Sequence, residues 1–193
     1  VLLDERDGGL SQVRNEIEKL IRKYDCKVII IDPIQDLFEG LNCKIVLEPG
    51  RSLVAEAGLL ISEVVFKKKG EERTFLIIDS AMNDLLRPSM YDAYHEIIAV
   101  EQNSGETEIV DIVGPVCETG DTFAQNRELP KFEEGELLAI CSAGAYGAAM
   151  ASTYNTRLLV PEVLVKKDQF SVIKKRRTYD ELIGLDNLAD WQS

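Results

Sequence analysis

An acid, a glycine and a cation directly follow a short apolar run, and their spacing could serve a phosphorylated cofactor. The run Lys44–Leu47 is typical of a strand, and the turn Glu48-Pro49-Gly50-Arg51 comes next. A carboxylate can pair with a protonated ring nitrogen, while a glycine amide and an arginine can bind a phosphate. The turn therefore suits a phosphorylated heteroaromatic cofactor, although a plain strand-ending turn has the same composition.

Three further strings place reactive side chains downstream of this turn. They span residues 82–91 (MNDLLRPSMY), 114–123 (GPVCETGDTF) and 144–155 (GAYGAAMASTYN). In this order and spacing, the four strings closely resemble the C-terminal part of diaminopimelate decarboxylase, which belongs to the alanine-racemase-like class of pyridoxal-phosphate enzymes. The resemblance covers roughly residues 33–193. It implies release of CO2 from meso-diaminopimelate to give L-lysine, a step of lysine biosynthesis.

The resemblance assigns four residues to the cofactor, pyridoxal 5'-phosphate. Glu48 would pair with the pyridine nitrogen, and Gly50 and Arg51 would meet the phosphate. Tyr146 would contact the cofactor or the substrate from the start of a predicted helix. The N-terminus of such a helix also offers free amides to an anion.

Cys117 matches the proton donor of the family. The ordinary pKa of a thiol, about 8.5, leaves it mostly protonated yet able to give up its proton. A lone cysteine is usually a small core residue, but the flanking Gly-Pro and Glu-Thr-Gly-Asp favour a catalytic origin. Cys26, Cys43 and Cys141 lack such surroundings, and we interpret them as structural thiols.

By the same resemblance, the substrate-binding residues would be Arg51, Arg87, Tyr91, Glu118 and Tyr146. Diaminopimelate carries a second amino-acid centre far from the reacting carbon. Glu118 would bind the ammonium group of this centre. Arg87 would donate two hydrogen bonds to its carboxylate, and the Tyr91 hydroxyl would donate another. An arginine there would repel the side chain of a basic amino acid, which favours diaminopimelate. The four-residue spacing of Arg87 and Tyr91 is by itself common on structural helical turns.

Short apolar segments separated by turn residues predict a mainly β protein with an α/β element. The opening reads as a helix over 10–24, a strand over 27–31 and a short helix over 34–41, the pattern of a parallel α/β unit. Further strands are expected at 59–67, 74–79, 95–100, 108–113, 137–141, 162–167 and 169–174, and helices at 145–152 and 179–185. We therefore predict a β-barrel-like C-terminal domain. The sole histidine, His95, begins one of these strands and is interpreted as structural.

The first 32 residues do not match the decarboxylase pattern. The strand that ends in Asp32 weakly resembles the second acidic strand of a RecA-like ATPase, although no GxxxxGK[ST] loop accompanies it. A buried strand ending at a turn aspartate is the simpler interpretation. We hypothesise a recombined, chimeric chain with its junction in 33–41, which divides it into segments 1–40 and 41–193.

Composition limits the partners. The 193 residues carry a formal net charge of −12, which argues against nucleic acid and acidic membranes as partners. No apolar run approaches 18 residues and no signal peptide opens the chain, so we expect no membrane segment and a cytoplasmic location. The four cysteines form no CxxC pair, which indicates reduced thiols and no metal site.

Two parts of a decarboxylase site are missing from the sequence. We find no convincing lysine to hold the cofactor covalently and no Gly-rich phosphate loop. The chain alone is therefore expected to be inactive, and a folded non-catalytic chimera or an ATPase fragment are alternatives. The family implies a possible homodimer. We nevertheless expect Arg51, Arg87, Glu118 and Tyr146 to gather beside Cys117 at one end of the domain or at a dimer interface.

Overall fold

A computed structural model describes residues 19, 28–31, 44–47, 50–101 and 105–192. The chain divides into two units, residues 1–53 and 54–193. The division proposed from the sequence at residue 40 concerns the origin of the segments and stays a prediction.

The first unit contains a parallel strand pair. Strands β1 (Val28–Ile31) and β2 (Lys44–Leu47) run side by side, with Val28 opposite Lys44. This pairing confirms both predicted strands and their parallel direction. The 3-10 turn η2 (Arg51–Leu53) follows. The helices predicted over 10–24 and 34–41 lie outside the described residues, apart from Lys19, which is helical.

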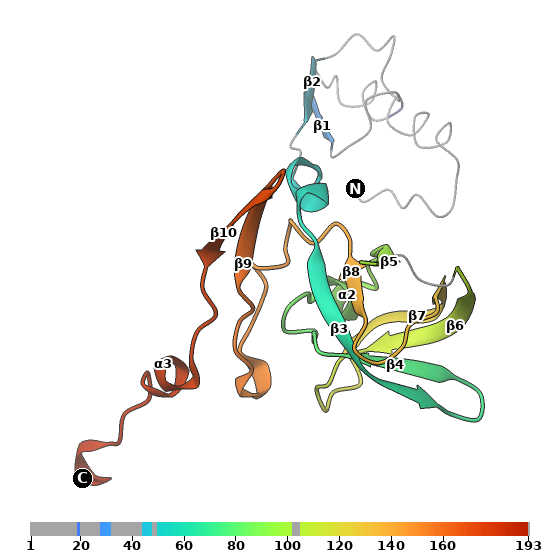
Figure 1. Cartoon of the computed structure of the whole chain (residues 1–193). Helices are drawn as coiled ribbons and strands as arrows, with labels where there is room; N and C mark the ends of the chain where they lie inside the picture. The colour runs from blue at the N-terminus through green and yellow to red at the C-terminus, as the bar shows by residue number, and fades with distance from the viewer. Residues whose placement is uncertain (1–18, 20–27, 32–43, 48–49, 102–104, 193) are drawn as a thin grey trace. The chain divides into compact units, whose positions relative to one another are not determined.

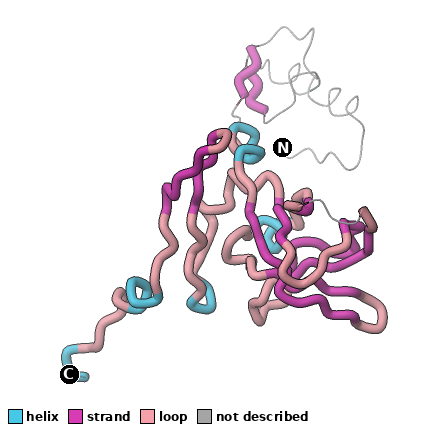
Figure 2. The backbone as a smooth tube through the Cα atoms, viewed as in Figure 1, coloured by secondary structure: helices cyan, strands magenta, loops and turns pink. Residues whose placement is uncertain are grey.

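The second unit is built on a six-stranded sheet (Figures 1 and 2). Its strands are β3 (Leu60–Lys69), β4 (Thr74–Ile78), β5 (Ile97–Ala99), β6 (Thr107–Val113), β7 (Thr122–Pro130) and β8 (Leu137–Ile140). They lie in the order β5-β8-β3-β4-β6-β7, and every neighbouring pair is antiparallel except β4–β6. Besides these strands, the unit contains the short helix α2 (Arg87–Tyr91) and the 3-10 turns η3 (Ala55–Ala57) and η4 (Tyr154–Thr156).

The sheet curls until its two edges meet, which confirms the predicted barrel-like fold. Strands β5 and β7 stand at opposite ends of the strand order, yet they contact each other. The Arg127 guanidinium, on β7, donates a hydrogen bond to the His95 carbonyl oxygen (2.8 Å) and covers the Tyr94 ring. This bond joins the two edges beyond the strand ladders.

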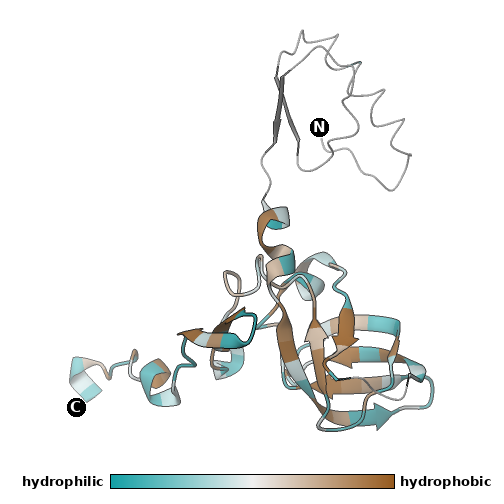
Figure 3. Ribbon diagram, turned by 45° about the horizontal axis from the view of Figure 1, so that its top comes forward, coloured by the Kyte–Doolittle hydropathy of each residue, from teal (hydrophilic) through white to brown (hydrophobic). Residues whose placement is uncertain are grey.

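The strands of the curled sheet supply most of the buried core, and Figure 3 shows hydrophobic stretches along them. In β4, Leu76 and Ile78 are fully buried, as the two-residue period of a strand requires. The other fully buried large side chains are Val64, Leu85, Val110, Ile112, Phe132, Leu138 and Ile140. Burial of these side chains favours the curled form of the sheet, and the curled sheet in turn determines where the loops at the strand ends lie.

Two expectations from the sequence are corrected. Strand β7 was not predicted, because its sequence TFAQNRELP is largely polar and is interrupted at Asn126, whose φ is 46°. The predicted helix at 145–152 is a run of turns instead. Tyr146 has a left-handed φ of 59°, which interrupts a right-handed helix near its predicted start.

The last residues form an arm, which we define as residues 162–192. It contains the antiparallel hairpin β9 (Glu162–Lys166) and β10 (Gln169–Lys174), the helix α3 (Tyr179–Ile183) and the 3-10 turn η5 (Asp190–Gln192). A capping box between Thr178 and Glu181 starts α3. Both strands and this helix were predicted. No described helix is long and apolar enough to cross a membrane.

Candidate active site

The string after β4 folds into a buried turn. The Asp84 carboxylate accepts a hydrogen bond from the Ala81 amide (2.9 Å), and the Asp84 amide donates to the Ala81 carbonyl (2.8 Å). The Leu85 side chain is buried in the core, which fixes the turn to the sheet. Arg157 adds a hydrogen bond to the Asp79 carbonyl (2.7 Å) and lies 3.9 Å from the Asp84 carboxylate. Residues 79–87 are thus fixed by the core through Leu85 and by Arg157.

Asn83 joins this turn to the string at 144–155. Its side-chain amide donates to the carbonyl oxygens of Ser152 (3.0 Å) and Tyr154 (2.8 Å). The Ser152 amide in turn donates to the Asn83 carbonyl (3.1 Å). Asn83 is buried, so these three bonds replace water for backbone groups that would otherwise be unsatisfied. Two strings about 70 residues apart in sequence are therefore one structural unit.

The cysteine string joins the same turn. The Asp121 carboxylate accepts a hydrogen bond from the Met82 amide (2.6 Å). The Ser89 hydroxyl, on α2, donates to the Gly120 carbonyl. All three downstream strings thus meet around residues 82–89, and this meeting could not be read from any one of them.

Arg87 begins α2 and lies against two aromatic rings. Its guanidinium carbon is 5.5 Å from the centre of the Tyr91 ring and 5.7 Å from that of Tyr146. Both distances suit cation–π attraction. Among the described residues, the Arg87 Nε atom is buried without a hydrogen-bond partner. A guanidinium held by two ring faces and still able to donate hydrogen bonds is suited to a carboxylate or phosphate.

Cys117 and Glu118 lie in the loop between β6 and β7, and both are exposed. One Glu118 oxygen accepts a hydrogen bond from the Gly120 amide (3.2 Å), which leaves the other oxygen without a recorded bond in the described structure. A thiol and a carboxylate therefore stand next to each other on a loop that is tied to α2. The loop can present a proton donor and an acceptor for a cation.

Tyr146 is 45% exposed and lies on the turn described above. The free amides that the sequence predicted at a helix N-terminus are not present there, because no helix begins at this point. The aromatic ring remains, and it faces Arg87. Tyr146 can therefore offer its ring face and its hydroxyl to a ligand.

The cofactor turn belongs to the first unit. Gly50 and Arg51 are both exposed, and the Gly50 carbonyl accepts a hydrogen bond from the Leu53 amide (3.5 Å). Glu48 lies outside the described residues. The structure thus brings Arg87, Tyr91 and Tyr146 together and ties the Cys117–Glu118 loop to them. The meeting of Arg51 with this group stays a prediction.

Several residues of this network were not singled out from the sequence. Three of them are buried polar residues within the strings already recognised: Asn83, Asp84 and Asp121. Their apolar neighbours in the sequence could have indicated that these polar side chains are buried and hydrogen-bonded. His95 is also buried, and its Nδ1 lies 2.8 Å from the Cys141 carbonyl oxygen. Burial raises the pKa of the Cys141 thiol, as expected for a structural cysteine.

Comparison with known proteins identifies the family to which the chain is similar. Residues 13–144 match the model of the C-terminal sheet domain of pyridoxal-dependent decarboxylases. The match begins well before residue 33, where the resemblance inferred from the sequence was expected to begin. A diaminopimelate decarboxylase from Zymomonas mobilis is 50% identical over 158 residues, which are 82% of this chain and 37% of that protein. One from Aquifex aeolicus is 49% identical over 154 residues, again covering 37% of the relative. The chain therefore spans well under half of these relatives.

Solved structures agree with the sequence relatives. The diaminopimelate decarboxylase from M. jannaschii superposes with a TM-score of 0.74 at 33% identity, covering 94% of this chain and 49% of that one. The Helicobacter pylori enzyme, solved with L-lysine, gives a TM-score of 0.69 at 34% identity over 95% of this chain and 51% of that one. The fold is shared over nearly the whole length of this chain.

Proposed function

The chain belongs to the pyridoxal-dependent decarboxylases, as their C-terminal sheet domain, and from this premise we propose that it serves the decarboxylation of meso-diaminopimelate to L-lysine. The observation that supports the proposal is the Arg87 guanidinium, which lies within cation–π distance of the Tyr91 and Tyr146 rings. Arg87 begins a helix that is hydrogen-bonded to the Cys117 loop. This arrangement combines a receptor for a carboxylate with a proton donor, as the reaction requires.

The donor set fits pyridoxal phosphate. Arg51 and Gly50 are exposed on a tight turn and can meet a phosphate, and Glu48 follows β2 directly as a partner for the ring nitrogen. Tyr146 would contribute its ring or its hydroxyl to the cofactor or the substrate. When bound, the cofactor supplies an electron sink for the electron pair left by the loss of CO2. The chain's own residues would hold it at the phosphate and at the ring nitrogen.

Cys117 would donate a proton to the carbon that loses CO2. Loss of CO2 breaks a carbon–carbon bond, and the carbon must then receive a proton to give the amine. An exposed thiol on a short, tied loop can deliver that proton and regain it from water. No other thiol in the described residues shares these features, because Cys141 is half-buried.

Arg87, Tyr91 and Glu118 would select the substrate. Arg87 can donate two parallel hydrogen bonds to a distal carboxylate, and Tyr91 can add a third from its hydroxyl. Glu118 would receive the distal ammonium. A substrate that lacks the distal carboxylate would leave the guanidinium unpaired, which penalises ornithine and lysine relative to diaminopimelate.

The proposal needs groups beyond those of the 193 residues. A covalent lysine and a Gly-rich phosphate loop would come from elsewhere in a complete enzyme, so the chain alone should not turn over substrate. We include a homodimer in the proposal, for which the exposed apolar side chains of the arm offer surface. The free Cys117 and Cys141 suit a reducing, cytoplasmic setting.

The test is a complete enzyme that contains this sequence, obtained by grafting it onto the N-terminal part of the Aquifex aeolicus relative. The parent graft is expected to release CO2 from meso-diaminopimelate and little from ornithine. Cys117→Ala should lower kcat by roughly 10²-fold or more, as loss of a general acid does. Cys141→Ala is the matched control and should retain activity.

The substrate assignment has its own control pair. Arg87→Lys keeps the charge but loses the two-pronged geometry, so KM for diaminopimelate should rise about 10-fold or more. Arg127→Lys changes the same residue type at the sheet edge and should leave KM within about two-fold. A graft that prefers ornithine, or an equal effect of both arginine variants, would refute the substrate assignment.

A further inference from the structure

A buried carboxylate stands inside the loop that carries Cys117. Asp121 is 3% exposed, and its two oxygens bond in different directions. Oδ1 accepts a hydrogen bond from the Met82 amide (2.6 Å), and Oδ2 accepts one from the Val116 amide (2.7 Å). Asp121 therefore connects the string of Arg87 to the residue that precedes Cys117.

Elementary hydrogen bonding explains why an aspartate occupies this position. The Met82 and Val116 amides are both donors, so they cannot bond to each other. An ionised carboxylate offers two acceptor oxygens and can bridge them. An asparagine of the same shape offers one acceptor and one donor, so it would leave one amide facing another N–H.

The loop is built to accommodate this bridge. The Gly114 amide donates to the Asp121 carbonyl (2.9 Å), and the Asp121 amide donates to the Glu118 carbonyl (3.0 Å). A Cβ at Gly114 would overlap the Asp121 carboxylate, so glycine is required for space. The two ends of the loop 114–121 are thus closed around the carboxylate.

We propose that Asp121 is a positioning residue, whose bridge between the Met82 and Val116 amides sets the Cys117 loop against the helix of Arg87. This inference rests on the proposed function and goes beyond it. The turn at Asn83 holds the Arg87 string independently through Ser152 and Tyr154. Loss of the bridge should therefore disturb the placement of the thiol more than that of the guanidinium.

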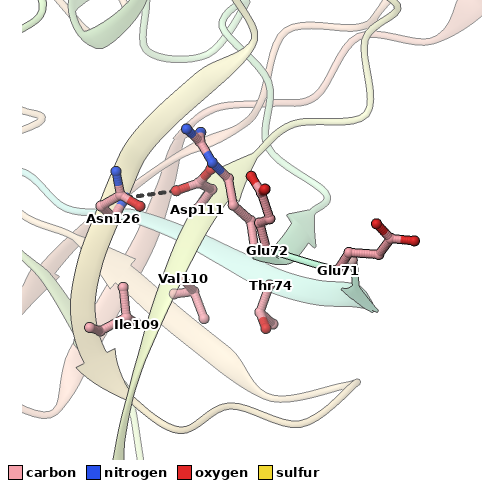
Figure 4. A pocket seen from close by; sticks show the side chains of 9 residues that line it. Glu71, Glu72, Thr74, Ile109, Val110, Asp111 and Asn126 are labelled. Atoms are coloured by element: carbon pink, nitrogen blue, oxygen red, sulfur yellow. Dashed lines mark hydrogen bonds and ion pairs between the residues drawn. The ribbon is translucent and has the colours of Figure 1, made fainter.

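A matched control exists elsewhere in the sheet. Asp111 is also 3% exposed, and it accepts a hydrogen bond from the Asn126 amide (2.6 Å), drawn in Figure 4, and one from Arg73 (3.2 Å). It lies in a pocket lined by residues of the β3–β4 turn and of β6, outside the candidate site. Asp111→Asn removes the same chemical group and touches none of the three strings.

The experiment compares Asp121→Asn with Asp111→Asn in the complete graft enzyme. Hydrogen–deuterium exchange should accelerate in peptides covering 80–86 and 114–121 for Asp121→Asn, and around Asn126 for Asp111→Asn. The kcat for diaminopimelate should fall about 10-fold or more in Asp121→Asn, with KM changed less, because misplacing a reacting group by about 1 Å is costly. Asp111→Asn should keep kcat within about two-fold of the parent.

Each result decides the proposal. Unchanged exchange at 114–121, unchanged kcat, or an equal loss of kcat in both variants would overturn it. If Asp121→Asn does not fold, Gly114→Ala decides instead, because it displaces the carboxylate without removing it. Lower kcat with faster exchange at 114–121 then supports the bridge, and an unchanged kcat or an unfolded protein assigns Asp121 to stability alone. A parent graft that releases no CO2 refutes the proposed function, whereas the exchange data still test the bridge.

Discussion

The side chains of residues 79–87 and those of the C-terminal arm have opposite surroundings. In 79–87, Ser80, Ala81, Asn83, Asp84 and Leu85 are buried. The Ser80 amide and the Asn83 side chain donate hydrogen bonds to segments distant in sequence, and the Asp84 carboxylate lies 3.9 Å from Arg157. In the arm, every residue from 163 to 181 is exposed, including Phe170 at 77%. The hydrogen bonds recorded within the arm are local.

This difference indicates how each region keeps its shape. The site turn is fixed by tertiary contacts, so its geometry is as stable as the core to which Leu85 belongs. The arm depends on its own hairpin and on a capping box, and an isolated two-stranded hairpin is marginally stable in water. Changes in the body should therefore affect global unfolding, while changes in the arm should affect only local opening.

The largest contrast is expected from leucine truncations. Leu76→Ala removes a fully buried side chain from β4 and should lower the free energy of unfolding by about 2–5 kcal/mol. Leu164→Ala removes the same atoms from a 60% exposed position in β9 and should change it by less than about 0.5 kcal/mol. Urea unfolding of both variants measures the contrast. Equal losses would show that the arm is packed in solution.

An asparagine pair tests the polar network. Asn83→Ala leaves the carbonyls of Ser152 and Tyr154 without their donor and should destabilise the fold by about 1–3 kcal/mol. Asn187→Ala, at an exposed position of the arm, should be neutral within about 0.5 kcal/mol. Thermal melting read by near-ultraviolet circular dichroism distinguishes them. A neutral Asn83→Ala would mean that water replaces the lost bonds.

Loss of the N-terminal cap should destabilise the helix of the arm without affecting the rest of the fold. Thr178→Ala removes the side chain that accepts from the Glu181 amide, so α3 should lose about 1 kcal/mol of local stability. Hydrogen exchange should accelerate in residues 179–183, while the global melting temperature stays constant. A lowered melting temperature would contradict the independence of the arm from the body.

The smallest effect is a pH dependence from Asp84. Burial is the largest cause that raises the pKa of this carboxyl above its ordinary 3.8, against the Ala81 hydrogen bond and the charges of Arg157 and Arg176. The folded state then binds the proton more tightly than the unfolded state. The carboxyl's contribution to stability is therefore largest below pH 3.8 and falls as pH rises through the folded-state pKa.

Asp84→Asn tests this sign. The parent's free energy of unfolding relative to that of the variant should decrease from acid toward neutral pH, as urea unfolding at several pH values would show. Asp121, whose pKa is also raised chiefly by burial, is present in both proteins, and its contribution cancels. A difference that grows with pH would show that the pairing with Arg157 outweighs burial.

The sequence by itself determined where several of the strands lie and which side chains are candidates for chemistry. Strands β2 and β4 follow apolar, β-branched runs, and their bounds came out nearly as predicted, because such runs both favour extended backbone and need to be buried. Cys117 and Arg87 were singled out because the strings around them resemble those of a known family, and their chemical roles stay predictions. Neither inference requires knowledge of a distant segment.

Only the tertiary structure decided which strings meet and through which atoms. The polar β7 is a strand because β6 pairs with it, and 145–152 is a run of turns in which Tyr146 has a left-handed φ. Asp121 bridges two amides 34 residues apart (116 − 82 = 34). Local patterns encode which face of a segment is buried, but a bond between separated segments depends on the register and curvature of the whole sheet.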